Sequence, residues 1–187
     1  MNIHPCYQTC YCEGRTTKSI EAYNIITSFA FLFVALKINK SKSLKNKCLL
    51  DYSLIILFFG STIFHYHYYN YAAYLDILGI ILVLISFIII KKNLSANIYF
   101  ITILFTTLIS LLYFNELFHE LTPIPLIVIC FLLFLYYLFF YKISLLQCLI
   151  TILLVIFWIT DRYSNICLHW LFHLTSAYLF YNLFITL

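Results

Sequence analysis

Five polar residues stand inside otherwise apolar stretches of the sequence, and their types could form a catalytic metal site. His65 follows Ser61 by four residues and His173 follows His169 by four, so each pair lies on one face of a helix. Asp76 stands in the apolar stretch after His65. Polar and ionisable groups are costly inside a membrane, which makes each of these residues a functional candidate.

Three histidines, a carboxylate and a hydroxyl form a chemically complete set for hydrolysis. Three imidazoles with an open fourth position are a ligand arrangement of catalytic zinc sites. The zinc would activate a water and polarise a carbonyl group. Asp76 would act as general base and Ser61 would donate a hydrogen bond to the oxyanion. The predicted zinc ligands are His65, His169 and His173.

Each of these residues also has a purely structural interpretation. A histidine pair in a membrane helix can simply bond to neighbouring helices. His65 can be an interfacial residue, Asp76 can extend to the membrane surface, and Ser61 can bond to its own helix. Only the joint arrangement favours a metal site.

The elements that must position these residues are membrane helices. Of the 187 residues, 64% are hydrophobic and 10% are charged, and the mean hydropathy is +0.98. A soluble domain is about 45–50% apolar, so the composition excludes a soluble globular enzyme and a disordered chain. The apolar stretches are continuous, which argues against a membrane β-barrel. The net charge is +4, and the lysines that contribute to it lie largely in short loops. This charge therefore does not indicate nucleic-acid binding.

We predict an all-α membrane protein, a single seven-transmembrane-helix bundle over residues 1–187 with a polar N-terminal tail at residues 1–19. Each apolar segment has about 17–23 residues, the length that a bilayer core requires. The tail lacks the apolar region of a cleavable signal peptide, so the first span must direct insertion. The predicted spans are Ile20–Ile38, Cys48–His67, Ala72–Ile90, Ile98–Phe114, Pro123–Tyr141, Ser144–Thr160 and Ile166–Leu187.

The lysines and arginines predict the orientation of this bundle. Eight of them lie in or beside the first, third and fifth loops, against three in the tail and the sixth loop. The positive-inside rule then places the N-terminus on the extracytoplasmic or lumenal side and the C-terminus in the cytoplasm. His65, Asp76 and His169 would meet near the extracytoplasmic face. A bacterial inner membrane and an endomembrane are both open alternatives.

Other polar residues and the cysteines have weaker interpretations. Asp161 and Arg162, after the sixth span, are interpreted as a surface pair of little energetic value. Cys167 is interpreted as a small buried residue. Three tail cysteines could form a disulfide or hold a metal, and both alternatives stay open. They are Cys6, Cys10 and Cys12.

Three blocks of the sequence together resemble the alkaline ceramidase family, within the superfamily of seven-helix membrane hydrolases that includes the adiponectin receptors. The blocks occur in the family's order, on the first, second, third and seventh predicted spans, while spans four to six match only as apolar helices. The blocks are Tyr11–Arg15 with Glu21–Asn24 and Thr27–Leu32, then Gly60–His65 with Asp76, and finally His169–His173.

The resemblance implies a role in sphingolipid metabolism: hydrolysis of the N-acyl amide bond of ceramide-like lipids to a sphingoid base and a fatty acid. It implies that His65, His169 and His173 hold zinc, with Ser61 and Asp76 beside the metal. The lipid substrate would enter a pocket within the bundle. No protein partner is inferred.

The resemblance also implies a calcium ion near the N-terminus. Glu13 and Glu21 stand at matching acidic positions, and carboxylate oxygens suit calcium. Cys10 and Arg15 depart from the residues of the animal members, so a weakened or absent calcium site is an alternative. A further alternative for Glu21 is a polar pair with Asn24 that fixes helix packing.

Three other functions compete with a ceramidase. The short loops argue against a receptor-like protein that signals through cytoplasmic partners. A hydrolase of another amide or ester lipid stays open, because nothing in the sequence selects a head group. A transporter with a polar relay would favour glycine- or proline-interrupted helices, and the chain has only 3 Gly and 3 Pro.

Overall fold

The computed structural model describes residues 21–40, 46–67, 70–114, 128–129, 132–133, 135–136, 143–164 and 166–187. The elements that it describes are all helical. Six helices have defined bounds: α2 (Ala22–Asn39), α3 (Lys47–His67), α4 (Asn70–Lys92), α5 (Asn97–Phe114), α7 (Leu145–Tyr163) and α8 (His169–Ile185).

The helices agree with six of the seven predicted spans, with ends that differ by a few residues. The fifth predicted span, Pro123–Tyr141, lies largely outside the described residues. Among the described helices, α2, α3 and α4 are long and apolar enough to cross a membrane, while α5 and α7 contain shorter apolar stretches. These helices indicate insertion into a membrane.

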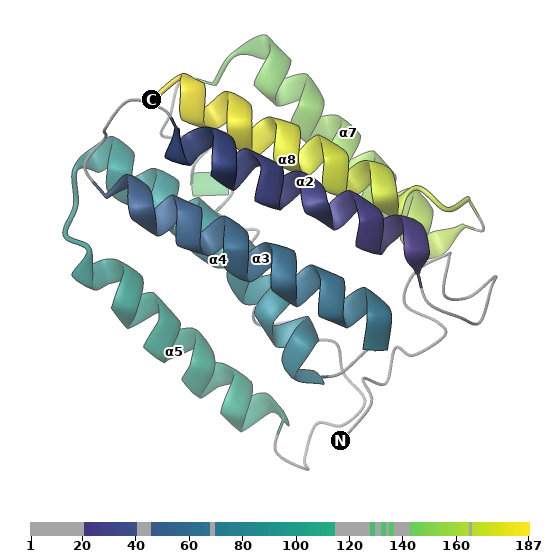
Figure 1. The fold of residues 1–187 in the computed structure, drawn as a ribbon, viewed down its shortest axis with the longest axis horizontal. Coiled ribbons are helices and arrows are strands. Elements are labelled where there is room, and N and C mark those ends of the chain that lie inside the picture. The colour runs from purple at the N-terminus through teal and green to yellow at the C-terminus, as the bar shows by residue number, and fades with distance from the viewer. Residues whose placement is uncertain are drawn as a thin grey trace.

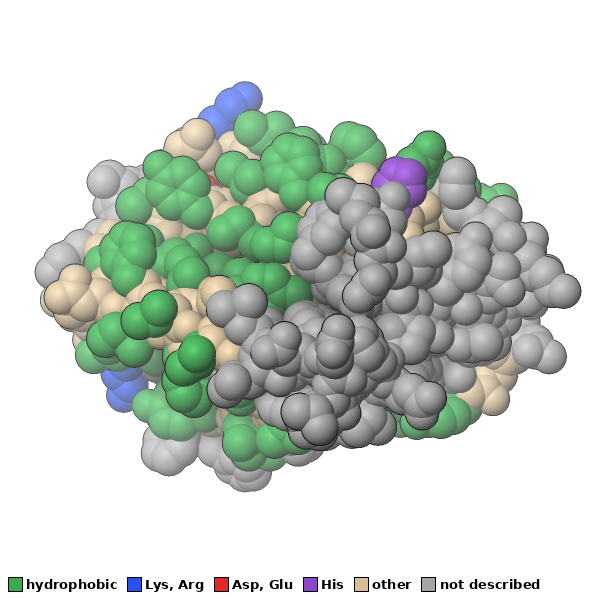
Figure 2. All heavy atoms as spheres, turned by 90° about the horizontal axis from the view of Figure 1, so that it is seen from below, with side chains coloured by type: hydrophobic (Ala, Val, Ile, Leu, Met, Phe, Trp, Pro, Cys, Tyr) green, Lys and Arg blue, Asp and Glu red, His purple; other side chains and the backbone are tan. Residues whose placement is uncertain are grey.

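The surface of the helices is apolar, as insertion requires. Hydrophobic side chains cover most of the described part of the face in Figure 2, with lysine and histidine side chains toward opposite ends. Large side chains such as Leu104, Leu145 and Tyr163 are more than 70% exposed. In water such a surface would favour aggregation, whereas lipid tails match it.

The helices pack side by side in the spatial order α5, α4, α3, α2, α8 and α7 (Figure 1). The first described helix, α2, therefore lies between α3 and the last described helix, α8. Its buried face, which includes Phe31, Val34 and Ile38, joins the main apolar core with residues of α3, α4 and α8. This arrangement places α2 and α8, which lie far apart in the sequence, side by side.

Helices α3 and α4 are in unusually close contact because two glycines lie between them. A Cβ atom built at Gly60 would lie 2.5 Å from the backbone nitrogen of Asp76. A Cβ atom at Gly79 would lie 2.5 Å from the Cα atom of Leu57. Small residues allow helix backbones to approach in this way, so Gly60 fixes how closely Asp76 approaches α3.

The described lysines gather at one end of the bundle. Lys37 and Lys40 lie at the end of α2, Lys47 begins α3, and Lys91 and Lys92 end α4. The Lys47 ammonium donates a hydrogen bond to the Asn39 carbonyl over 2.9 Å. The histidines of α3 and α8 lie at the opposite helix ends. The bundle thus has a lysine end and a histidine end.

Helix α7 begins with a clear local signal and ends later than the sequence predicts. Ser144 and Gln147 form a capping box, in which each side chain hydrogen-bonds to the other residue's backbone N–H. At the other end, the helix continues to Tyr163 and includes Asp161, which the sequence placed in a loop.

Candidate metal centre

Three buried histidines from two helices form one cluster. His65 lies in the last turn of α3, His169 begins α8, and His173 follows one turn later. Their imidazole ring centroids are 4.7–5.1 Å apart. One candidate ligand nitrogen from each residue lies within 4.8 Å of the other two, so the cluster could hold a metal ion. The structure therefore brings together the three residues predicted as ligands.

A buried carboxylate orients the His65 imidazole. The Nδ1 atom of His65 pairs with Oε2 of Glu21, and both side chains are fully buried. Asn24 Nδ2 donates a second hydrogen bond to the same carboxylate oxygen over 2.8 Å. A neutral imidazole that donates from Nδ1 keeps its lone pair on Nε2. Carboxylate–histidine–metal triads use this arrangement to fix the ligand nitrogen.

A backbone carbonyl of α2 fixes the His173 imidazole in the same way. Nδ1 of His173 lies 3.0 Å from the carbonyl oxygen of Asn24. A carbonyl oxygen can only accept, so Nδ1 carries the proton and Nε2 holds the lone pair. The Ser28 hydroxyl lies 3.3 Å from the same Nδ1 atom. Helix α2 thus orients one histidine of α3 and one of α8.

Both predicted catalytic residues lie beside the cluster. Ser61 is fully buried, and its hydroxyl lies 3.4 Å from Nε2 of His173 and 3.1 Å from the Ser28 hydroxyl. The half-buried Asp76 carboxylate contacts the Ser61 hydroxyl and interacts electrostatically with His65. The close approach of α4 at Gly60 holds Asp76 in this position.

The structure corrects the interpretation of Asp161 as part of a surface pair. Asp161 is fully buried. Its Oδ1 atom accepts hydrogen bonds from the backbone N–H groups of Leu168 and His169, over 3.0 and 3.1 Å. The first N–H groups of a helix lack partners within the helix and attract negative charge. Since Leu168 makes no side-chain cap, Asp161 of α7 fixes the start of α8 and with it His169.

Ser28 and Asp161 contribute to the site, but the sequence did not single them out as metal-site residues. Ser28 lies one turn from Asn24 on the buried face of α2, and only its place in the Thr27–Leu32 block drew attention to it. The signal for Asp161 was weak, because the sequence alone rarely distinguishes a buried acidic residue at the end of an apolar helix from a solvated one.

Of the other sequence-based predictions, one is confirmed, one is wrong, and the rest concern residues outside the described part of the chain. The predicted Asn24–Glu21 pair is present as a hydrogen bond. Glu13 lies outside the described residues, as do the tail cysteines Cys6, Cys10 and Cys12, so the calcium site stays a prediction. Cys167 is disulfide-bonded, and its interpretation as a small buried residue is wrong.

No family model, curated protein or solved structure matches this chain. Function must therefore be inferred from the residues and from the geometry of the site. The donor set consists of nitrogen atoms alone, which suits zinc and similar transition metals better than calcium or magnesium.

Proposed function

We propose that this chain is a zinc-dependent membrane amidase of the alkaline ceramidase type, built as a seven-helix bundle. It hydrolyses the N-acyl amide bond of ceramide-like lipids. The observation that carries this proposal is the position of Asp76 and Ser61 beside three buried histidines inside apolar helices. The sequence blocks that resemble the family also converge here, since Asn24 and Ser28 of the first block contact His173 of the last.

The donor set fits a catalytic zinc ion. His65, His169 and His173 would hold it, and zinc supplies Lewis-acid activation of a water and of an amide carbonyl. The buried contacts of Glu21 and Asn24 with two of these histidines pre-orient their Nε2 atoms for this task.

The remaining residues of the site move protons and stabilise charge. Asp76 takes a proton from the attacking water and returns it to the leaving nitrogen. The water oxygen bonds to the carbonyl carbon, the carbon–nitrogen bond breaks, and the products are a fatty acid and a sphingoid base. Ser61 donates a hydrogen bond to the carbonyl oxygen as negative charge develops on it. Apolar helices around the site accept the lipid chains.

Two observations support an extracytoplasmic or lumenal site. The lysine end of the bundle lies opposite the histidines, and lysines favour the cytoplasmic side. Cys167, two residues before His169, is disulfide-bonded, and disulfides persist in oxidising compartments. The N-terminus is then extracytoplasmic and the C-terminus cytoplasmic.

The test is fatty-acid release from a panel of ceramides by the purified protein in detergent. We expect release by the wild type, its loss in His173→Ala, and its retention in His67→Ala, which changes an exposed histidine outside the cluster. Zinc content should be about one per chain in the wild type and lower in His173→Ala. Absence of release from folded, zinc-loaded protein would exclude these ceramides and point to another amide or ester lipid.

A further inference from the structure

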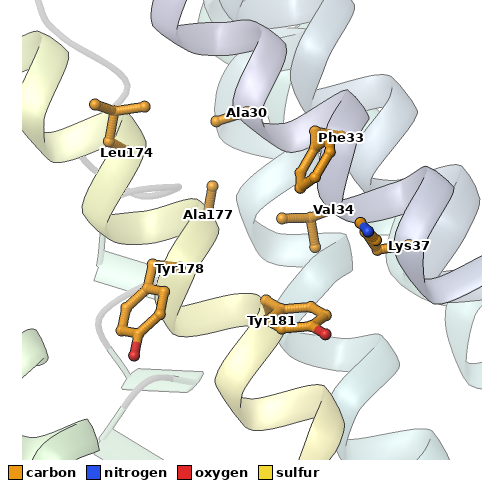
Figure 3. A pocket seen from close by; sticks show the side chains of 8 residues that line it. All are labelled: Ala30, Phe33, Val34, Lys37, Leu174, Ala177, Tyr178 and Tyr181. Atoms are coloured by element: carbon orange, nitrogen blue, oxygen red, sulfur yellow. The ribbon is translucent and has the colours of Figure 1, made fainter.

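An open groove runs along the outside of the bundle between α2 and α8 (Figure 3). It has a volume of about 270 Å³. Phe33 of α2 and Tyr178 of α8 form its walls and are 60% and 50% exposed. The groove is separate from the histidine cluster and extends toward the lysine end of the bundle.

The shape and lining of the groove suit a hydrocarbon chain. Ala30 of α2 and Ala177 of α8 leave space between the two helices, and Val34 is buried beneath them. From Ala30 to Lys37 the groove follows α2 for about 10 Å, roughly a third of a 30 Å hydrocarbon core. Its volume is below that of pockets that enclose a whole small molecule. It therefore accommodates a segment of one acyl chain.

The end of the groove carries a positive charge near the end of α2, where a helix that crosses a membrane meets the lipid headgroups. Lys37 lies two residues before the end of α2, about 3 Å along the helix axis. Its Nζ atom lies 5.3 Å from the centroid of the Phe33 ring. Lys40 follows one turn later and is exposed. On the α8 side, Tyr181 lines the groove (Figure 3) and offers a phenol hydroxyl.

We propose that this groove binds an anionic phospholipid, with one acyl chain between α2 and α8 and the headgroup phosphate at Lys37. An ammonium group and a phenol hydroxyl are both donors to a phosphate oxygen, and lysines at a membrane surface attract anionic lipids. A second copy of this chain fits less well. A symmetric dimer through this groove would bring two Lys37 side chains to the same interface, where they repel.

Native mass spectrometry tests the proposal on the purified full chain. The protein is released from detergent that contains equal amounts of phosphatidylglycerol and phosphatidylcholine with identical acyl chains. We expect the phosphatidylglycerol adduct to exceed the phosphatidylcholine adduct by about fivefold, the effect of one surface lysine. Lys37→Gln should abolish this preference. Lys91→Gln, a lysine of α4 at the same end of the bundle, should retain it.

A second pair of variants tests the groove itself. Ala30→Leu fills it with a good helix former, whereas Ala22→Leu makes the same change at an exposed position of α2. Only Ala30→Leu should reduce the adduct, and if that variant does not fold, the comparison of the two lysine variants decides. Equal retention of both lipids, equal loss in Lys91→Gln, or a lipid-free dimer would overturn the proposal.

Discussion

Gly60 offers the sharpest test of how the bundle positions Asp76, the proposed catalytic carboxylate. In Gly60→Ala, the new Cβ atom would lie 2.5 Å from the Asp76 nitrogen and from the Leu75 carbonyl carbon. Both are backbone atoms, so no side-chain rotation relieves the overlap. Ordinary contact begins near 3.4 Å, so α4 must move away from α3 by about 0.9 Å, and Asp76 moves with it.

This displacement has two measurable consequences. Overpacking of this kind costs about 1–3 kcal/mol of stability, which lowers Tm by about 2–12 °C for a domain of this length. A misplacement near 1 Å reduces catalysis by about 10²-fold. Zinc binding should change little, because the three proposed ligands lie on α3 and α8. The assays are thermal unfolding in detergent, zinc content by mass spectrometry, and fatty-acid release.

The matched control is Phe59→Ala, which changes the neighbouring, exposed residue of α3. It should leave Tm and turnover close to wild type. If Gly60→Ala unfolds at the wild-type temperature, the close α3–α4 contact is not present in the membrane-inserted protein. If Tm falls and turnover is unchanged, the position of Asp76 does not limit the reaction.

Three further substitutions separate the roles of the other residues. Glu21→Gln removes the charge beside His65 and should lower zinc affinity by about 10- to 100-fold in a chelator competition; unchanged affinity would refute its orienting role. Asp161→Ala removes the acceptor at the start of α8 and should cost about 0.5–2 kcal/mol of stability and weaken zinc binding through His169, which thermal unfolding and the same competition measure. Ser61→Ala should lower turnover by about 10²–10³-fold at unchanged zinc content, and a loss of zinc would instead make Ser61 part of the ligand set.

The helices and the histidine cluster could be predicted because each depends on a local signal. Long apolar stretches define the spans, and the i, i+4 spacing of His169 and His173 survives any error of one or two residues in the helix ends. The antiparallel order of short-looped helices then brings His65 and Asp76 to the same end as His169.

The supporting residues could not be predicted because their roles depend on tertiary geometry. No local sequence signal shows that α7 continues past Thr160, or that the Asp161 carboxylate contacts the first backbone N–H groups of α8. The contacts of Glu21 with His65 and of Asn24 with His173 require α2 to lie between α3 and α8, which the sequence does not encode in any short motif. The role of Gly60 depends on an interhelical distance.

The position of α2 between α3 and α8 also constrains how the site is made during biosynthesis. Helices α2 and α3 emerge first and can pair Glu21 with His65 at once. His169 and His173 follow about a hundred residues later, a delay of roughly 5–20 s at ordinary rates of translation. Until then the growing chain presents one of the three cluster histidines, His65, already engaged by a carboxylate. Loading of the proposed metal would therefore be a late step, and a ribosome-stalled or prematurely terminated chain that lacks α8 would have no complete histidine cluster.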